Sequence, residues 1–241
     1  PPLLILDPCN FLPFYNINLG AALCRQGWKV EWITSAFPFE NIRIPNSINV
    51  NTAFYSRHFL SALLNYKSIR GSPIRGMIKG LTYPFEMMSF HSRFRHRSPG
   101  IIHVQWSNLP WSDILMWTWW QRQGWRIIYT AHDVVPLRGT TPRFFSLANA
   151  RLFGQADAVV VHSEYARRKI LKFGIAPRKI ARIPLSLSHN NGHRKLDQAA
   201  ACRKLGIPED KPKILFFGFI KPYKGLHVLL ESLSYVRKSV D

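Results

Sequence analysis

The sequence has few acidic residues, few cysteines and no long hydrophobic run. Asp and Glu number 13 against 33 Lys and Arg in 241 residues, which leaves a formal net charge of +20 at pH 7. Three scattered cysteines, Cys9, Cys24 and Cys202, are too few for a disulfide framework, and none has a partner at zinc-ligand spacing. No apolar run reaches the length of a membrane span or resembles a secretory leader. We therefore expect a cytoplasmic protein without a bound metal.

The composition excludes a wholly disordered or fibrous chain. Apolar residues make up 46% and charged residues 19%, as in ordinary globular proteins, and we find no internal repeat. The length suits one large domain, or one domain and part of another. The excess of positive charge produces a surface potential that attracts phosphates, anionic lipids or nucleic acid. An acidic partner or ligand is therefore expected.

Short apolar runs predict a set of buried strands separated by helices. The predicted strands lie at residues 3–6, 30–34, 101–105, 127–130, 158–162 and 214–217. Most are continuously apolar, which is typical of parallel strands covered on both faces. Helical spacing follows Tyr15 up to Gly27, and again after Ser163, which suits an N-cap. The alternation predicts an α/β fold with a doubly wound, Rossmann-like parallel sheet.

Two stretches interrupt this alternation. Residues 57–97 contain eight Lys or Arg and one acid, Glu86, and we expect exposed helices and loops there. Residues 185–213 are polar, and a new strand follows them. We therefore predict a first domain at 1–185, a linker at 186–212, and the first βα unit of a second Rossmann-like domain at 213–241.

Candidate ligand-binding residues follow two of the predicted strands, because ligands of open α/β sheets bind outside the carboxyl ends of the strands. Asn10 lies in the loop after the first strand, where it either caps the next helix or contacts a ligand. That loop contains no glycine, so a pyrophosphate grip like that of an NAD enzyme is not expected. His132 and Asp133 follow another strand and suit binding of a sugar hydroxyl or phosphate, or acid–base chemistry. A surface His beside a capping Asp would explain the pair equally well.

Two further histidines have more ordinary expectations. His103 lies inside its strand, so we expect a core histidine with a satisfied hydrogen bond. His162 ends a strand directly before Ser163, and we favour a structural role for it.

The segment from 216 to 225 combines several phosphate-binding features. Gly218 allows close approach of a ligand to the backbone, Lys221 and Lys224 can neutralise a diphosphate, and Gly225 precedes a helix whose dipole favours anions. A solvated turn is the alternative. The convergence of glycine, cations and a helix start favours phosphate binding.

Taken in order, these segments resemble the family-4 glycosyltransferases, retaining enzymes of the GT-B architecture with two Rossmann-like domains. The matching stretches are LLILDP, YNINLGAALCRQGWKVEWIT, IIHVQW, IIYTAHDVVPL, ADAVVVHSEYARRKILKFGIAPRKIARIPLSLS and LFFGFIKPYKGLHVLLESL. They cover nearly the whole chain except 57–97. The resemblance implies an acceptor-side first domain and the start of a sugar-nucleotide domain.

The resemblance also implies roles for particular residues. His132 matches the histidine that contacts the donor sugar near the reacting centre, and Lys224, before Gly225, matches the lysine that grips the donor diphosphate. The family often has Arg where this chain has Phe219, and Lys221 is a candidate substitute without the bidentate fork. The family's paired glutamates, which bind the donor sugar and its ribose, lie later in the C-terminal domain than residue 241. Acceptor-binding residues are expected at Asn10, Tyr15 and Asp133.

The implied activity is transfer of a hexose from a nucleotide diphosphate to a glycan or lipid-linked acceptor, with the nucleotide sugar as substrate and no cofactor. We expect the 241 residues alone to be inactive.

Arg93, Arg95 and Arg97 are candidates for peripheral contact with the anionic inner face of a membrane, where polysaccharide biosynthesis would take place. A solvated basic face is the alternative. Two other classes stay open. One is a non-catalytic acceptor-binding remnant, and the other is a nucleic-acid-binding protein, which the charge suggests but no RNP-like, zinc-finger or helix-turn-helix signature supports.

Overall fold

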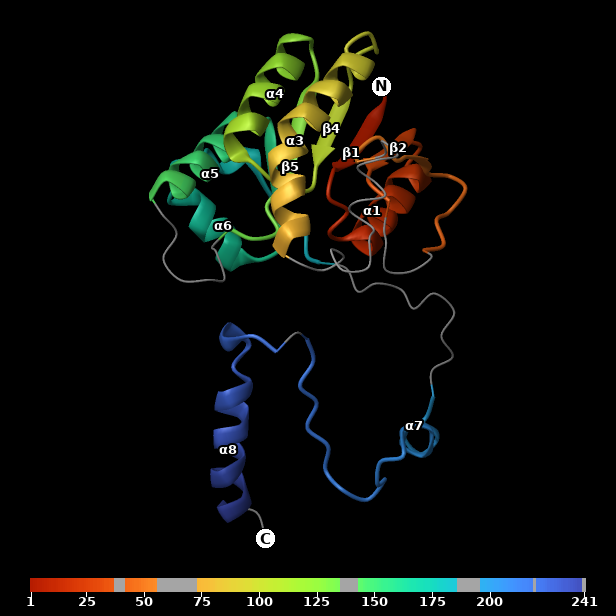
Figure 1. The fold of residues 1–241 in the computed structure, drawn as a ribbon, viewed down its shortest axis with the longest axis vertical. Helices are drawn as coiled ribbons and strands as arrows, with labels where there is room; N and C mark the ends of the chain where they lie inside the picture. The colour runs from red at the N-terminus through yellow and green to blue at the C-terminus, as the bar shows by residue number, and fades with distance from the viewer. Residues whose placement is uncertain (37–41, 56–72, 135–142, 186–195, 219, 240–241) are drawn as a thin grey trace. The chain divides into compact units, whose positions relative to one another are not determined.

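The computed structural model describes residues 1–36, 42–55, 73–134, 143–185, 196–218 and 220–239. The chain divides into two compact units (Figure 1). In the described part of the chain, the first unit runs from residue 1 to 185 and the second from 196 to 239.

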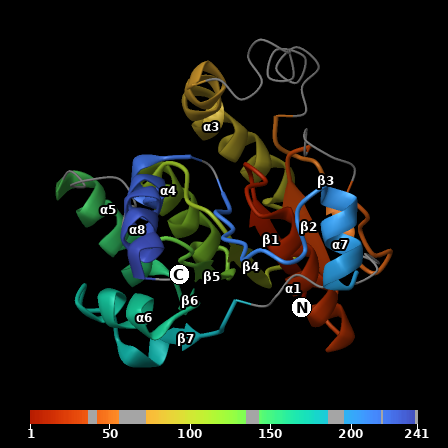
Figure 2. The ribbon, with the colours of Figure 1, turned by 90° about the horizontal axis from the view of Figure 1, so that it is seen from below.

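The first unit is built on a seven-stranded sheet in which every neighbouring pair of strands is parallel. The strands are β1 (Leu3–Asp7), β2 (Val30–Thr34), β3 (Asn49–Asn51), β4 (Ile101–Val104), β5 (Arg126–Thr130), β6 (Ala158–Val161) and β7 (Ile180–Arg182). Their order is β3-β2-β1-β4-β5-β6-β7, and the labels of Figure 2 follow it across the sheet. The chain therefore winds outward in both directions from β1 and β4, which confirms the predicted doubly wound, Rossmann-like fold.

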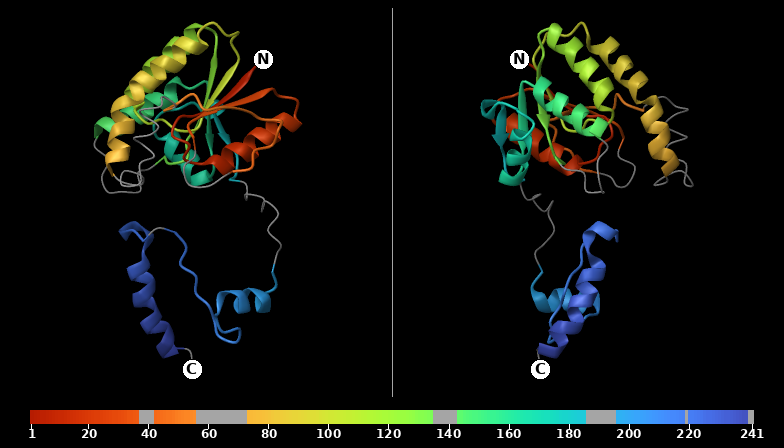
Figure 3. Two further views of the ribbon diagram at one scale, coloured as in Figure 1. Left: turned by 45° about the vertical axis from the view of Figure 1, so that its right-hand side comes forward. Right: turned by 90° about the vertical axis from the view of Figure 1, so that its left-hand side faces the viewer.

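Helices cover the sheet (Figure 3). They are α1 (Pro13–Arg25), α3 (Pro73–Phe94), α4 (Pro110–Arg122), α5 (Arg143–Gln155) and α6 (Glu164–Leu171), with a 3-10 turn, η1, at Pro177–Lys179. Side chains from the helices and strands form two hydrophobic cores. Successive residues of β1 point to opposite faces. Leu4 and Leu6 join the core formed with α3, α4 and α5, whereas Leu3 and Ile5 join the core under α1. Burial on both faces explains why β1 is continuously apolar.

Local sequence signals account for several helix ends. Ser163 accepts a hydrogen bond from the Ala166 amide at 3.1 Å, as predicted for an N-cap. Gly27 has a φ of 85° and follows the last turn of α1, where a left-handed residue ends the helix. The expected capping role of Asn10 is wrong, since α1 begins at Pro13 with no side-chain cap.

The structure differs from the sequence prediction between residues 73 and 97. We expected exposed helices and loops, but α3 buries Tyr83, Met87, Phe90 and Phe94 in the larger core. These residues recur at helical spacing, so one side of the helix faces the sheet layer. Residues 57–72 of the same prediction lie outside the described ranges.

The second unit contains α7 (Gln198–Leu205), the 3-10 turn η2 (Pro222–Lys224) and α8 (Leu226–Ser239). The strand predicted at 214–217 is not formed. A strand needs a neighbour to bond its backbone, and the described residues of this unit include no other strand. The apolar side chains consequently remain uncovered, with Leu215 83% and Phe217 88% exposed.

Candidate functional site

The carboxyl ends of the central strands gather most of the polar candidates in the first unit. Asp7 ends β1, Gln105 follows β4, His132 follows β5 after one residue, and His162 follows β6. Backbone bonds continue beyond the strands and fix these positions. The Gln105 amide donates to the Leu6 carbonyl at 2.9 Å, and the Ala131 amide donates to the Val160 carbonyl at 2.8 Å.

Asp7 organises the loop between β1 and α1. Its Oδ2 accepts a hydrogen bond from Asn16 at 2.8 Å, and its Oδ1 accepts one from the Phe11 amide at 3.4 Å. Burial raises the pKa of the Asp7 carboxyl, while the hydrogen bonds from Asn16 and the loop amides oppose that shift. The carboxylate therefore shapes the loop rather than facing solvent.

Asn10 sits in this loop with a φ of 54°, a left-handed conformation that asparagine tolerates. Its Nδ2 donates to the Ser35 carbonyl at 2.8 Å. Its Oδ1 is buried and has no hydrogen-bond partner within the described residues. Asn10 thus holds the loops after β1 and β2 together and retains one unused acceptor.

His132 and His162 lie in direct contact. His162 Nε2 is 3.2 Å from His132 Nδ1, and His162 Nδ1 is 2.9 Å from the Ile183 carbonyl oxygen, which follows β7. His132 Nε2 is 3.2 Å from the Gln105 side-chain amide. Both ring nitrogens of His132 are therefore engaged by neighbouring side chains.

Aromatic rings enclose this histidine pair. Trp106 stacks on His132 with ring centroids 4.9 Å apart, and Tyr15 of α1 meets His132 and His162 edge-on at 5.0 and 5.4 Å. Phe11 packs edge-on against Trp106, with the two ring centroids 5.3 Å apart. The enclosure removes water, and this desolvation, with a smaller effect of His162 and His103, lowers the pKa of His132 to about 3. His132 is accordingly neutral at pH 7.

A second polar network supports the loop between β4 and α4. Ser107 donates to Asp113 Oδ2 at 2.6 Å, and Tyr83 of α3 donates to Asp113 Oδ1. Along this loop and its neighbours, buried polar atoms remain without a partner among the described residues. These are the side-chain nitrogens of Gln105, Trp106 and Asn108 and the Ser35 hydroxyl.

The structure brings together some predicted residues of the first unit and not others. His132 and Tyr15 meet, and Asn10 lies in the loop that carries Phe11 of the aromatic enclosure. Asp133 is exposed beside them. His103 is buried with its Nε2 2.7 Å from the Thr130 hydroxyl, which confirms the expected core histidine.

Sequence reasoning missed three contributors to this site, namely Gln105, Trp106 and the contact role of His162. The available signal was their place at the carboxyl end of a predicted strand, since Gln105 and His162 end predicted strands and Trp106 directly follows one.

The three arginines predicted to touch a membrane have partners within the first unit. Arg93 donates to the Ala53 carbonyl at 2.9 Å, and Arg95 Nε is 3.0 Å from His96 Nε2. Arg97 pairs with Glu31 and lies over the Phe94 ring.

In the second unit, one compact turn carries the predicted phosphate-binding residues. The Lys224 amide donates to the Lys221 carbonyl at 2.9 Å, and Gly225, with a φ of 73°, directly precedes α8. Gly218 has a φ of 125°. Lys224 Cε lies about 4.0 Å from the position that a Cβ on residue 218 would occupy. Phe219 lies outside the described residues.

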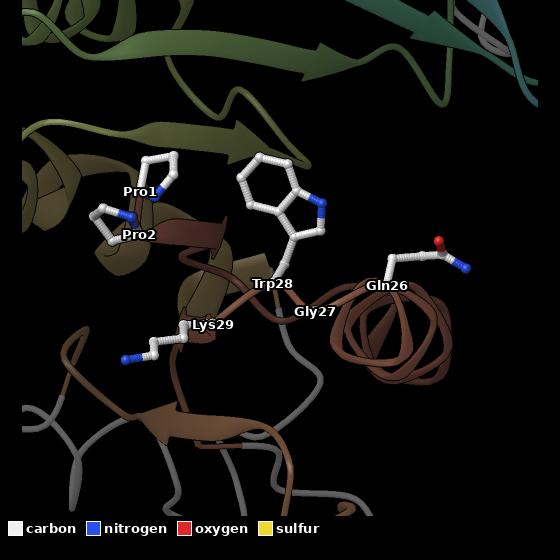
Figure 4. Close-up of a pocket in the computed structure, with 6 residues that line it drawn as sticks. All are labelled: Pro1, Pro2, Gln26, Gly27, Trp28 and Lys29. Carbon is white, nitrogen blue, oxygen red and sulfur yellow. The ribbon is translucent and has the colours of Figure 1, made fainter.

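A hollow of about 570 Å³ lies elsewhere in the first unit (Figure 4). Pro1, Pro2, Gln26, Gly27, Trp28 and Lys29 line it. These residues precede β1 and β2, so the hollow is at the amino ends of the strands, opposite the histidine pair. None of the predicted site residues lines it.

Within the described ranges, no three His, Cys, Asp or Glu side chains gather as metal ligands, and no helix is long and apolar enough to cross a membrane.

The chain is 28% identical over 231 residues to a D-inositol 3-phosphate glycosyltransferase of Geodermatophilus obscurus, covering 90% of the chain and 48% of that protein. It is 22% identical over 233 residues to the protein of the same name from Kineococcus radiotolerans, covering 90% and 50%. The chain thus spans about half the length of the curated relatives it matches.

Solved structures share the fold. Sucrose-phosphate synthase from Thermosynechococcus elongatus superposes with a TM-score of 0.67 at 17% identity, covering 98% of this chain and 60% of that one. The Anabaena protein Alr3699/HepE in complex with UDP and glucose gives a TM-score of 0.55 at 16% identity, covering 97% and 57%. The Glycosyltransferase Family 4 pattern matches residues 14–188, which include the whole histidine cluster. The chain therefore belongs to Glycosyltransferase Family 4.

Proposed function

We propose that the chain forms the acceptor-side part of a retaining enzyme that transfers a hexose from a nucleotide diphosphate to a glycan or lipid-linked acceptor. The observation that carries the proposal is His132 at the carboxyl edge of the sheet, in contact with the rings of Trp106 and Tyr15 and with the Gln105 amide. Aromatic faces and hydrogen-bonding groups together suit a sugar ring. The Anabaena neighbour was solved with UDP and glucose, which supports a nucleotide-sugar donor.

The proposed chemistry needs no side-chain nucleophile. Sugar transfer with retention develops positive charge on the sugar and negative charge on the departing diphosphate, so stabilising both charges lowers the barrier. Lys224 and Lys221, on the turn before α8, supply the cations for the diphosphate. His132 is neutral and adds a hydrogen bond to a sugar hydroxyl without repelling the positive sugar.

The second unit explains the expected inactivity of these residues alone. Leu215, Phe217 and Ile220 are exposed to 83%, 88% and 78%, so the described residues provide no packed sheet behind the turn. A diphosphate grip needs such a support to hold the lysines in place. We therefore expect the 241 residues alone to bind a donor weakly and to transfer no sugar.

A fusion tests the proposal. Residues 1–241 are joined to the C-terminal portion of the Geodermatophilus relative that they do not match. Transfer from a panel of nucleotide sugars is measured, with NMR of the product anomer. The fusion should transfer with retention, and its His132→Ala variant should lose about ten- to a hundredfold in kcat/KM. Inversion, or full activity of the variant, would refute the assignment, and turnover by the 241 residues alone would refute the expected inactivity.

We add a second proposal, that α3 contacts an anionic membrane surface peripherally. Opposite its buried side, α3 presents five large apolar side chains that are 53–70% exposed. They are Ile74, Met77, Leu81, Phe85 and Met88. A helix that is apolar on both sides needs a second apolar environment. Between 73 and 97 the chain has five Lys or Arg, while its one acid, Glu86, is buried.

The positive charge of the chain favours an anionic lipid surface over a second copy of the chain as the partner that covers this side of α3. A second copy of a chain with a net charge of +20 would be repelled. An anionic lipid surface attracts the basic residues while its acyl boundary accepts the apolar side chains. The membrane is therefore the proposed occupant, and an acceptor attached to a lipid would lie at the same surface.

A further inference from the structure

The hydrogen-bond partners of His162 determine where its own proton lies. A backbone carbonyl only accepts hydrogen bonds, so the contact of 2.9 Å with the Ile183 oxygen requires a hydrogen on His162 Nδ1. In the neutral ring, Nε2 then has a lone pair and no hydrogen. His162 consequently presents an acceptor to the ring it faces.

That acceptor in turn determines the tautomer of His132. His162 Nε2 lies 3.2 Å from His132 Nδ1, and two lone pairs would repel each other at this distance. His132 Nδ1 must therefore donate. The low pKa of His132, which burial causes, means that the ring holds a single hydrogen at pH 7. Its other nitrogen, Nε2, is then an acceptor.

The side-chain amide of Gln105 can supply the donor that an acceptor at His132 Nε2 requires. His132 Nε2 lies 3.2 Å from one end of that amide, while the buried Gln105 nitrogen has no partner in the described part of the chain when the oxygen faces the ring. The oxygen and nitrogen of an amide are told apart by their partners. With the NH₂ group toward His132, the nitrogen gains an acceptor and the lone pair of Nε2 gains a donor.

We propose that His162 is a positioning residue that holds His132 as the Nδ1–H tautomer, so that Nε2 accepts a hydrogen bond from a hydroxyl of the bound sugar. The identity of the ligand rests on the proposed function, whereas the hydrogen bonds from the Ile183 carbonyl through His162 to His132 do not. Because Nε2 has one lone pair, the sugar hydroxyl takes the place of the Gln105 NH₂ group there and meets an acceptor of fixed direction. Tyr15, packed edge-on against both rings, holds the two imidazoles in contact.

The tautomer can be measured directly in the 241-residue chain. Histidine labelled with ¹⁵N is observed at pH 7.5 by long-range proton–nitrogen NMR, and the signals are assigned with His132→Ala. We expect a protonated Nδ1 and an unprotonated Nε2 for His132. A protonated Nε2, or a rapidly exchanging mixture of tautomers, would overturn the proposal.

Two substitutions separate the contacts of His162. In His162→Asn the amide keeps a donor near the Ile183 carbonyl but stops short of His132, whereas in His162→Gln the amide oxygen reaches toward His132 Nδ1. The Asn variant should release His132 into a mixture of tautomers, and the Gln variant should restore the Nδ1–H form. Unchanged methyl spectra show that both are folded. A wild-type tautomer in the Asn variant would overturn the proposal.

The fused enzyme supplies the functional reading. His162→Asn should lower kcat/KM about tenfold, the effect of one misplaced hydrogen bond, and His162→Gln should recover most of it. A shifted tautomer with unchanged kcat/KM would overturn the positioning role. If the unsubstituted fusion transfers no sugar, the proposed function fails, while the NMR result still decides the His162–His132 relationship by itself.

Discussion

The Tyr83 hydroxyl donates a hydrogen bond of 2.5 Å to Oδ1 of Asp113, and both residues are buried to 1% exposure. The bond joins α3 to α4, while Ser107 holds the other carboxylate oxygen at 2.6 Å. Burial raises the pKa of Asp113 to about 6, against the effect of the hydrogen bonds from Ser107 and Tyr83. The loop that carries Gln105 and Trp106 to His132 therefore depends on a buried carboxylate between two helices.

Removing the Tyr83 hydroxyl should destabilise the first unit. Tyr83→Phe leaves a buried carboxylate oxygen short of a donor, and we expect the free energy of unfolding at pH 7 to fall by about 1–3 kcal/mol in urea titrations. Asp113→Asn is the matched control. Its amide oxygen still accepts from Tyr83 and its NH₂ can donate to Ser107, so the loss should be smaller. A larger loss in the control would show that the negative charge itself is needed.

Acid should weaken the fold through His103. Its burial lowers its pKa to about 4, so the unfolded chain takes up a proton near pH 6.5 that the folded chain refuses. The stability of the wild type relative to His103→Gln should therefore fall by about 2 kcal/mol between pH 7 and pH 5. Unfolding in urea at both pH values measures the difference. A difference that does not change with pH would mean that His103 titrates normally.

The turn before α8 should contribute to transfer in the fused enzyme. Lys224→Ala removes a charged hydrogen bond to the leaving diphosphate, and turnover should fall by about ten- to a hundredfold. Lys221→Ala should have a similar effect if that lysine compensates for Phe219. Lys213→Ala, on the same unit with its ammonium on the Glu209 carbonyl, is the control and should be silent. Full activity of a folded Lys224→Ala protein would remove the phosphate assignment.

The exposed side of α3 should drive binding to anionic vesicles. Changing Leu81 and Phe85 together to Ser removes apolar insertion without touching the buried side, so co-sedimentation with vesicles containing phosphatidylserine should fall at least tenfold. Leu147→Ser, on α5 and 67% exposed, is the matched control.

The contribution of charge to vesicle binding is measured by varying the salt concentration. Because ionic attraction is screened within about 10 Å at 0.1 M salt, binding should weaken as salt rises, and Arg95→Glu should weaken it further. Arg93 and Arg97 are unsuitable for charge reversal, since both hold partners inside the first unit. Equal binding to neutral and anionic vesicles would contradict the proposal.

Local sequence patterns were sufficient for the features that depend on neighbours along the chain. The apolar run at 3–6, Ser163 as an N-cap and Gly27 as a helix end all appear where periodicity and backbone preference place them. The same patterns predicted a strand at 214–217, which did not form, because strand formation depends on a partner that no local pattern supplies.

The contacts of the site needed tertiary structure. Gln105, His132 and His162 are separated by 27 and 30 residues, and only the parallel order of β4, β5 and β6 brings their rings and amide within hydrogen-bond distance. The sequence alone was enough for the doubly wound fold and the position of His132 after its strand, since both follow from the alternation of strands and helices. The sheet decided which atoms His132 meets, because hydrogen-bond direction depends on distances between strands that composition and spacing do not contain.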